Sequence, residues 1–335
     1  MKKFGIIILT ALAAFLLLLA SAAGLAWWWA NSPVQLANEP VDYLVEPGSS
    51  PTRVANTMVA AGIKLNPKAF VAMARLSGLD RRLKAGAYEA VAGDSPWRLL
   101  NRMADGDMLQ SRLTFVEGWT YARIRQALAS DPNVKDTLDD VSDKELAERL
   151  GITTTSLEGW FYPDTYVFAK GTSDFDILRR AYQAQLQKLE AFWANRADNL
   201  PLKTPYDALI LASIIEKETG HAPDRERVAG VFINRLRVGM PLQTDPSVIY
   251  GMGEAYQGRI RKRDLTTDTP WNTYTRNGLP PTPIASAGTA ALQAALQPEE
   301  HAYYYFVSRG DGTSQFSRNL AEHNRAVAKY ILGRN

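Results

Sequence analysis

The hydrophobic pattern divides the chain into an apolar N-terminus and a longer part in which short apolar periods alternate with polar turns. No charged residue occurs from position 4 to position 30. That run is long enough to cross a bilayer as a helix, which needs roughly 20 apolar residues. Three tryptophans at 27–29 close the run, where aromatic rings favour the membrane interface. The pattern predicts a cytoplasmic stub and transmembrane helix at 1–30, followed by a polar linker at 31–40.

The charges that flank the apolar run predict its orientation. Lys2 and Lys3 precede it, and the positive-inside rule keeps them in the cytoplasm. Everything after about Asn31 then lies outside the cytoplasm. The competing interpretation is a cleaved signal peptide, with the small residues at 20–22 as the cleavage site, although the apolar run continues past that site. The chain has no cysteine, which is compatible with an oxidising compartment.

Residues 41–110 contain a near-repeat that predicts strand–turn–helix units. The segment 48–58 aligns with 93–103, and a fainter third copy begins at Gly118. In each of the first two copies an extended segment ends at a glycine turn, and a serine followed by a proline then starts a helix. The stretch 91–95 also resembles the opening of a LysM module, a small fold that binds N-acetylglucosamine polymers. We therefore expect a LysM-like small domain at 41–110.

The remainder, 111–335, is expected to form a mixed α+β domain. Apolar residues at helical spacing, together with capping signals, predict helices at 143–150, 174–193, 204–218, 224–238 and 320–332. Two aromatic-rich runs around the turn 309–312 predict a hairpin. The segment 240–289 is predicted to be largely loop, and its amide and hydroxyl side chains beside aromatic rings suit a carbohydrate ligand. The predicted fold class is α+β.

Two glutamates at the end of the 204–218 helix are the strongest candidates for chemistry. This helix is apolar nearly all round, so it is expected to be buried, and periodicity does not choose between Glu216 and Glu218. The two side chains project about 200° apart, so they do not form a pair on one face. Burial and the negative end of the helix dipole both favour a protonated carboxyl group, as general acid catalysis requires. The alternative is a salt-bridged helix end, with Lys217 or a nearby arginine as the partner.

Composition narrows the function classes. The 335 residues are 46% hydrophobic and 22% charged, which is typical of globular proteins and argues against disorder and a polytopic membrane protein. Lys and Arg number 38 against 35 Asp and Glu, a balance that does not indicate nucleic acid binding. The absence of cysteine excludes thiolate chemistry, and the presence of only three histidines argues against a histidine-rich metal site.

Motifs around the 204–218 helix resemble the endolytic murein transglycosylase family (YceG-like, MltG). They are the runs 216–219, 231–236, 242–246, 272–274 and 278–281, with a further signature upstream at 158–166. The resemblance implies a single-pass inner-membrane protein whose C-terminal catalytic domain lies in the periplasm. It also implies cleavage within nascent peptidoglycan glycan strands that leaves 1,6-anhydro-N-acetylmuramic acid ends, and it assigns the catalytic glutamate to Glu216.

The expected mechanism needs one carboxyl group and no cofactor. Glu216 protonates the glycosidic oxygen and then takes the proton of the sugar's own 6-hydroxyl, which closes the anhydro ring. The candidates for substrate contacts are Gln243, Thr244, Asp245, Asn272 and Tyr274. Expected partners are the glycan strands and the inner membrane; glycan synthases are a further candidate, which no motif names.

Three other functions stay open at this point. A hydrolytic muramidase would pair Glu216 with a second acid such as Asp245. A peptidoglycan-binding scaffold would depend on the LysM-like units alone. A pyridoxal-phosphate lyase needs a Schiff-base lysine and a phosphate cradle, and the sequence has no convincing glycine-rich anion loop.

Overall fold

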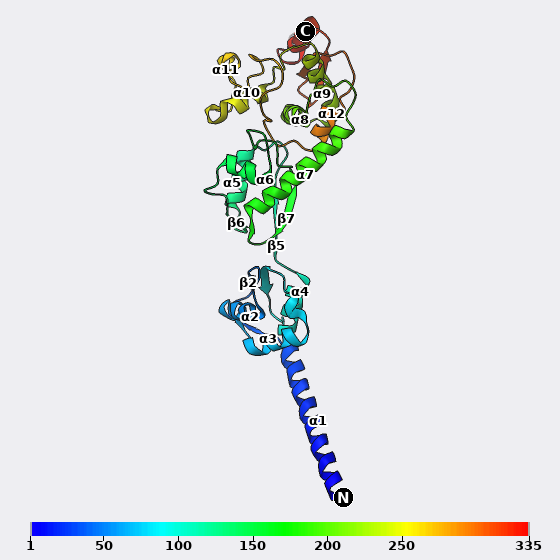
Figure 1. Cartoon of the computed structure of the whole chain (residues 1–335). Coiled ribbons are helices and arrows are strands. Elements are labelled where there is room, and N and C mark those ends of the chain that lie inside the picture. The colour runs from blue at the N-terminus through cyan, green and yellow to red at the C-terminus, as the bar shows by residue number, and fades with distance from the viewer. Residues whose placement is uncertain (1, 334–335) are drawn as a thin grey trace. The chain divides into compact units, whose positions relative to one another are not determined.

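The computed structural model describes residues 2–333, with side chains from residue 6 onward. It divides into two compact units, Met1–Ser111 with Val167–Thr172, and Arg112–Tyr166 with Ser173–Asn335. Helices and short strands are mixed in both units (Figure 1), so the fold is α+β, as the sequence predicts. Met1, residues 334–335 and the side chains of Lys2 and Lys3 lie outside the described part of the chain, so the predicted orientation by the two lysines is not tested.

The apolar N-terminus forms one continuous helix, α1 (Lys2–Asn31). Its stretch Ile6–Asn31 is long and apolar enough to span a membrane. Almost all of its described side chains are exposed, but Ala30 near its end is buried. Just beyond the helix, the N–H of Val34 donates to the carbonyl oxygen of Asp94 at 2.8 Å. The helix therefore leads directly into the packed part of the first unit.

Two strand–turn–helix repeats build the first unit, and their strands pair with each other. β2 (Val41–Val45) leads through a glycine turn to α2 (Pro51–Ala60), and β4 (Gly86–Ala90) leads in the same way to α4 (Pro96–Asp105). Both turn glycines have positive φ, a conformation that a side chain disfavours. The predicted serine caps each helix, and the predicted proline follows it. β2 and β4 form an antiparallel pair, with alternate residues of β2 buried.

The segment 31–40, predicted as a linker, is attached to this unit by its backbone. It carries β1 (Gln35–Leu36), which pairs antiparallel with β3 (Ile63–Lys64). After β3 comes α3 (Pro67–Leu76), which packs against α2 and α4. Figure 1 shows the end of α1 beside α3 and α4 of the same unit.

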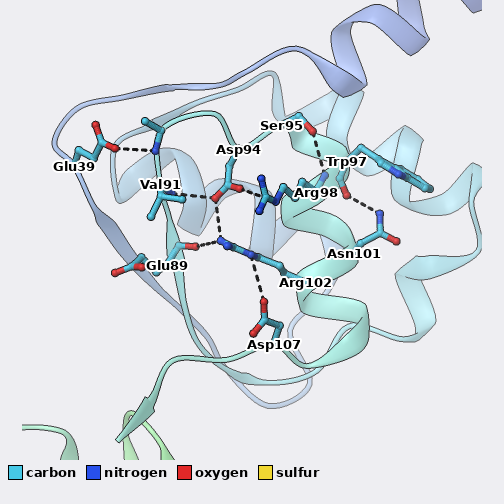
Figure 2. A network of polar contacts seen from close by, with 11 residues as sticks. Glu39, Glu89, Val91, Asp94, Ser95, Trp97, Arg98, Asn101, Arg102 and Asp107 are labelled. Atoms are coloured by element: carbon cyan, nitrogen blue, oxygen red, sulfur yellow. Dashed lines mark hydrogen bonds and ion pairs between the residues drawn. The ribbon is translucent and has the colours of Figure 1, made fainter.

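A buried carboxylate holds the second repeat together. Asp94 is fully buried, and its Oδ2 accepts hydrogen bonds from the N–H of Val91 at 3.0 Å and from Nη1 of Arg102 at 2.9 Å (Figure 2). Arg102 also donates to the carbonyl oxygen of Glu89 at 2.8 Å. Since Val34 donates to the backbone of Asp94 as well, this residue connects β4, α4 and the segment that follows α1.

The second unit is built around a buried helix. α8 (Pro205–Glu218) packs against α7 (Asp174–Ala194), α9 (Ala222–Arg237) and α12 (Thr289–Leu296). Figure 1 shows these helices gathered in one bundle. α12 is rich in alanine, so its backbone can approach α8 and α9 closely. Because neighbours cover α8 on several sides, its apolar residues lie all round it, as the sequence predicts.

Shorter elements complete the second unit. They are α5 (Tyr121–Ser130), α6 (Asp143–Leu150), the hairpin of β9 (Tyr305–Ser308) and β10 (Ser314–Ser317), and α13 (Leu320–Tyr330). The remaining strand pairs are β5 (Gln110–Thr114) with β7 (Thr165–Ala169), and β6 (Val134–Lys135) with β8 (Thr172–Ser173). The hairpin and the closing helix confirm the sequence prediction.

The region 240–289 is less irregular than the sequence predicts. It contains α10 (Asp245–Met252) and α11 (Lys262–Thr266). Thr244 caps α10 and a proline lies in its first turn, which is a regular helix start. The glycines at 251 and 253 at the other end of this short helix obscured that signal in the sequence.

Candidate active site

The end of α8 carries the predicted acid groups because the helix has a defined start and a buried body. The hydroxyl of Thr204 accepts a hydrogen bond from the N–H of Asp207 at 3.2 Å, and the carboxylate of Asp207 accepts one from the N–H of Thr204 in return. The residues 208–215 are all buried. α8 ends at Glu218, so both predicted glutamates lie in its last turn, at the edge of the apolar core.

Glu216 faces the start of α12. Its side chain is half-buried, and Oε2 accepts a hydrogen bond from the N–H of Gly288, the N-cap residue of α12, at 3.0 Å. Burial raises the pKa of Glu216 above its ordinary value, and the nearby charge of Glu117 raises it further. The N–H of Gly288 and the cations Arg225 and Lys217 act in the opposite direction. The net effect is a pKa of Glu216 above its ordinary value, which makes the protonated form more accessible than in an exposed glutamate.

Glu117 is a second carboxylate at this site, and sequence analysis missed it. A Cβ added to Gly288 would collide with Oε1 of Glu117, so the carboxylate lies directly against the glycine backbone. The loop that carries Glu117 is fixed in place: Gly118 donates to the carbonyl oxygen of Ser286 at 2.8 Å, and Lys217 Nζ donates to that of Gly118 at 3.2 Å. Glu117 is far from Glu216 in the sequence and belongs to no periodic pattern, so no signal indicated this contact.

Glu218 faces a different set of residues, as its spacing from Glu216 requires. Its Oε2 is buried and has no hydrogen-bond partner among residues 2–333. Burial raises the pKa of Glu218 to about 7, the charge of Asp245 adds to the rise, and Arg235 opposes it. The guanidinium group of Arg235 donates to the carbonyl oxygens of Tyr304 and Leu242, both at 2.7 Å. This arginine therefore fixes the chain that leads into α10.

Two predicted substrate-contact residues meet next to Glu218. The hydroxyl group of Tyr274 donates a hydrogen bond to Oδ1 of Asp245 at 2.6 Å. Asp245 is exposed at the first position of α10, and Tyr274 is half-buried. The nearby charge of Glu218 is one of the causes that raise the pKa of Tyr274, so these three side chains form one cluster, which we call the Glu218 cluster.

The side chains of the other three predicted contact residues differ in exposure and in how many hydrogen bonds they form with the protein. Gln243 is exposed and has a positive φ of 50°, a rare conformation for a residue with a side chain. Thr244 is buried and uses its hydroxyl to cap α10. Asn272 is fully buried; its Nδ2 donates to three carbonyl oxygens at 264, 265 and 267, and its Oδ1 accepts from the N–H of Tyr274 at 2.9 Å. Asn272 thus holds the loop that presents Tyr274.

A third carboxyl group with a raised pKa lies in the upstream motif. Glu158 is 4% exposed, and burial raises its pKa to about 7. Its oxygens accept hydrogen bonds from the N–H of Tyr121 at 3.0 and 3.2 Å and from the hydroxyl of Tyr250 at 3.2 Å. These three residues border a cavity of about 640 Å³. The aromatic residues that follow Glu158, at 160–162, are buried, as expected for core positions.

The three carboxyl groups with raised pKa differ in their hydrogen-bond partners. Glu158 accepts hydrogen bonds from surrounding donors, and one buried oxygen of Glu218 has no hydrogen-bond partner in the described part of the chain. Glu216 is half-buried, with one oxygen held by Gly288. A general acid has to reach the atom that it protonates; Glu216 and Glu218 are both half-buried, so exposure alone does not choose between them. No group of three or more histidines and carboxylates in the described part of the chain has an arrangement suited to a metal ion.

These features define a mixed α+β protein with a long apolar N-terminal helix and a second unit that carries carboxylic acids of raised pKa. Residues 43–329 match the model of the YceG-like family, and the chain belongs to this family. The resemblance predicted from the motifs is therefore confirmed.

Two curated relatives bear the name "Endolytic murein transglycosylase". The protein of Bacillus subtilis (strain 168) is 31% identical over 313 residues, which cover 88% of this chain and 86% of that protein. The protein of Streptococcus pneumoniae serotype 2 is 27% identical over 318 residues, 85% of this chain but 57% of the longer relative. A solved structure of a YceG-like protein from Listeria monocytogenes is similar at a TM-score of 0.56 and 30% identity, covering 86% of this chain and 98% of that one.

Proposed function

We propose that this chain is a lytic transglycosylase of peptidoglycan that cleaves the bond between N-acetylmuramic acid and N-acetylglucosamine within glycan strands. The names of the B. subtilis and S. pneumoniae relatives support this activity. The observation that carries the assignment of the acid is the hydrogen bond from the N–H of Gly288 to half-buried Glu216, a donor that can stabilise the carboxylate after proton transfer; Oε2 of Glu218 has no such donor among residues 2–333. The expected products are strands with 1,6-anhydro-N-acetylmuramic acid ends, and the expected consequence is the termination of glycan elongation.

The proposed reaction uses Glu216 twice. The protonated carboxyl group gives its proton to the glycosidic oxygen as the bond from that oxygen to C1 breaks. The 6-hydroxyl oxygen of the same sugar then bonds to C1, and its proton returns to the carboxylate. No water is consumed, so a second carboxylate to activate water is not required.

The surroundings of Glu216 suit both halves of this cycle. Burial and the charge of Glu117 favour the protonated form before cleavage. The N–H of Gly288, at the N-terminus of α12, stabilises the carboxylate that exists after the proton has left. The pKa is therefore raised without making the anionic state inaccessible, as acid–base catalysis needs.

The proposed substrate contacts fall into two groups. Gln243, Asp245 and Tyr274 keep exposed surface and are proposed to touch the glycan. Thr244 and Asn272 have their polar side-chain atoms occupied by the protein, so we propose that they act by holding α10 and the loop before Tyr274 in place.

The proposed location is based on α1. We propose that this helix spans the inner membrane once, with the N-terminal lysines in the cytoplasm and both units in the periplasm. The proposed boundaries are 1–30 for the anchor, 31–40 for the connection, 41–110 for the LysM-like domain and 111–335 for the catalytic domain. Glycan synthases are proposed neighbours because they would supply the nascent strands.

Product mass separates this function from its alternatives. The full chain in detergent is incubated with purified, uncrosslinked glycan strands, and the new ends are measured by mass spectrometry. Anhydro ends are expected. Ends that are heavier by one water would instead indicate a hydrolytic muramidase, for which Glu117 rather than Asp245 is the carboxylate beside Glu216. Binding of the strands without any cleavage would indicate a scaffold.

A further inference from the structure

Helix α3 presents three different faces along its ten residues. Phe70 and Ala74, one turn apart, are fully buried in the core of the first unit. Met73 and Leu76 lie on a second face, and Lys68 and Arg75 on a third. The second and third faces each line a groove, so this short helix separates an apolar groove from a basic one.

The apolar groove is continuous with the end of α1. It has a volume of about 810 Å³ and is bordered by the α1 residues Leu25 and Trp29, by Met73 and Leu76 of α3, and by Trp97 of α4. Leu76 is 90% exposed and Trp97 is 38% exposed, an unfavourable arrangement in water for large apolar side chains. Because the first wall of the groove is the last part of the apolar helix, this face lies where the helix would leave a bilayer.

The basic groove lies on the other side of α3. It has a volume of about 1160 Å³ and shares Trp29 with the apolar groove. Lys64, Lys68 and Arg75 line it, together with polar residues such as Asn66. All three cations are exposed, and none of them forms an ion pair within residues 2–333. Unpaired cations beside an apolar groove match the chemistry of an anionic phospholipid, which has a phosphate next to acyl chains.

The connection between α1 and the first unit is short and ordered, so the helix constrains how this face meets a membrane. Ala30 is buried, and Val34 is hydrogen-bonded to Asp94, whose carboxylate also holds α4 through Arg102 (Figure 2). The stretch Ile6–Asn31 would be about 39 Å long as a helix, against about 30 Å for the hydrocarbon core. Its last turns therefore reach the headgroup layer, and they bring α3 with them.

We propose that the two grooves on α3 dock the first unit onto the bilayer leaflet at the C-terminal end of α1. Acyl chains then lie in the apolar groove, and an anionic phospholipid headgroup lies against Lys64, Lys68 and Arg75. This docking rests on the proposed membrane insertion of α1. Leu76 and Trp97 then enter the leaflet beside Trp27 and Trp29. The first unit is thereby held flat against the membrane rather than swinging freely from its anchor.

Site-directed spin labelling of the full chain in vesicles tests the proposal. The chain has no native cysteine, so Leu76→Cys gives a single labelling site. Leu44→Cys is the matched control, because Leu44 is another exposed leucine of the first unit (52% exposed) that lines neither groove. Collision of the label with oxygen, which concentrates in lipid, is compared with collision with a water-soluble nickel complex. The label at 76 is expected to be in lipid and the label at 44 in water.

Lipid charge tests the basic groove separately. In vesicles that contain phosphatidylglycerol the lipid-immersed population at position 76 should exceed that in pure phosphatidylcholine. Replacing Lys64, Lys68 and Arg75 with glutamine should reduce the ratio of lipid-immersed to water-exposed label by about fivefold per charge removed. Equal immersion in both lipids, or no effect of the triple substitution, would overturn the headgroup assignment. A label at 76 as water-exposed as the one at 44 would overturn the docking as a whole.

Flotation of the same vesicles distinguishes the two proposals. If the protein floats with the vesicles while the label at 76 stays in water, α1 is inserted and only the docking of α3 is wrong. If the protein does not float with the vesicles, the membrane placement of α1 fails and the docking fails with it.

Discussion

The substitution Glu117→Gln tests whether a neighbouring carboxylate helps Glu216 to keep its proton. Glu117 lies against the backbone of Gly288, whose N–H donates to Glu216, and its charge raises the pKa of Glu216. Glutamine keeps the size of the side chain and removes the charge. The pKa of Glu216 should therefore fall. Since the reaction needs Glu216 protonated, activity should be lost at a lower pH in the variant than in the wild type.

The size of this change follows from the exposure of Glu117. Its side chain is exposed, so water screens its charge. Interactions of this kind are worth about 0.2–1 kcal/mol, and one pKa unit corresponds to about 1.36 kcal/mol. The alkaline midpoint of activity should move down by about 0.1–0.7 pH. Burial, the larger cause of the raised pKa, is unaffected by the substitution, so the pKa of Glu216 should stay above its ordinary value.

The assay is the pH profile of kcat/KM for the release of anhydro ends from soluble glycan strands. Glu190→Gln is the control, because Glu190 is an exposed carboxylate on α7 that does not contribute to the pKa of Glu216. Its profile should match that of the wild type. A midpoint in Glu117→Gln that stays in place or moves up would refute the electrostatic reasoning. Loss of activity at every pH would instead give Glu117 a direct part in the chemistry.

Three further substitutions test separate parts of the structure. The pKa of half-buried Glu218 is raised to about 7, so the wild type loses stability as pH rises from the ordinary carboxyl pKa to about 7. From pH 5 to pH 8.5 the free energy of unfolding of Glu218→Gln, measured in urea, should therefore rise by about 2–3 kcal/mol relative to that of the wild type. Gly288→Ala places a Cβ against the carboxylate of Glu117 and should displace that carboxylate, which lowers the alkaline midpoint of activity. Combined with Glu117→Gln, it should not move the midpoint further than Glu117→Gln alone. Asp94→Asn weakens the bond to Arg102 and should lower the free energy of unfolding of the first unit by about 1.5–3 kcal/mol; an unchanged thermal transition would contradict this.

Local signals predicted much of the fold. The serine–proline pairs of the near-repeat start α2 and α4, and the signal at Thr204 starts α8, because an N-cap acts over three or four neighbouring residues. α10 begins with the same kind of capping signal at Thr244, but the helix is short and contains glycine, so the sequence pattern did not predict it. The pairing of β2 with β4 is a contact between distant segments, which local patterns do not specify.

The site was predictable only as far as residue types and short motifs reach. The helix pattern placed two glutamates at the end of α8 and correctly required that they face different partners. The helix pattern did not choose between Glu216 and Glu218. Periodicity distinguishes a buried face from an exposed one only in an amphipathic helix, and α8 is apolar nearly all round. The proximity of Glu117 to Gly288 and the internal hydrogen bonds of Asn272 depend on tertiary packing, so neither was visible in the sequence.

The central claim is that Glu216, and not the acid two residues further along, gives its proton to the glycan. The most direct test compares Glu216→Gln with Glu218→Gln on isolated strands, using product mass as the readout and circular dichroism to verify folding. General acid–base catalysis contributes about 10²–10⁴-fold, so folded Glu216→Gln should release anhydro ends at least 100-fold more slowly than wild type, while Glu218→Gln continues to release them. Release of anhydro ends by Glu216→Gln at the wild-type rate would contradict the claim.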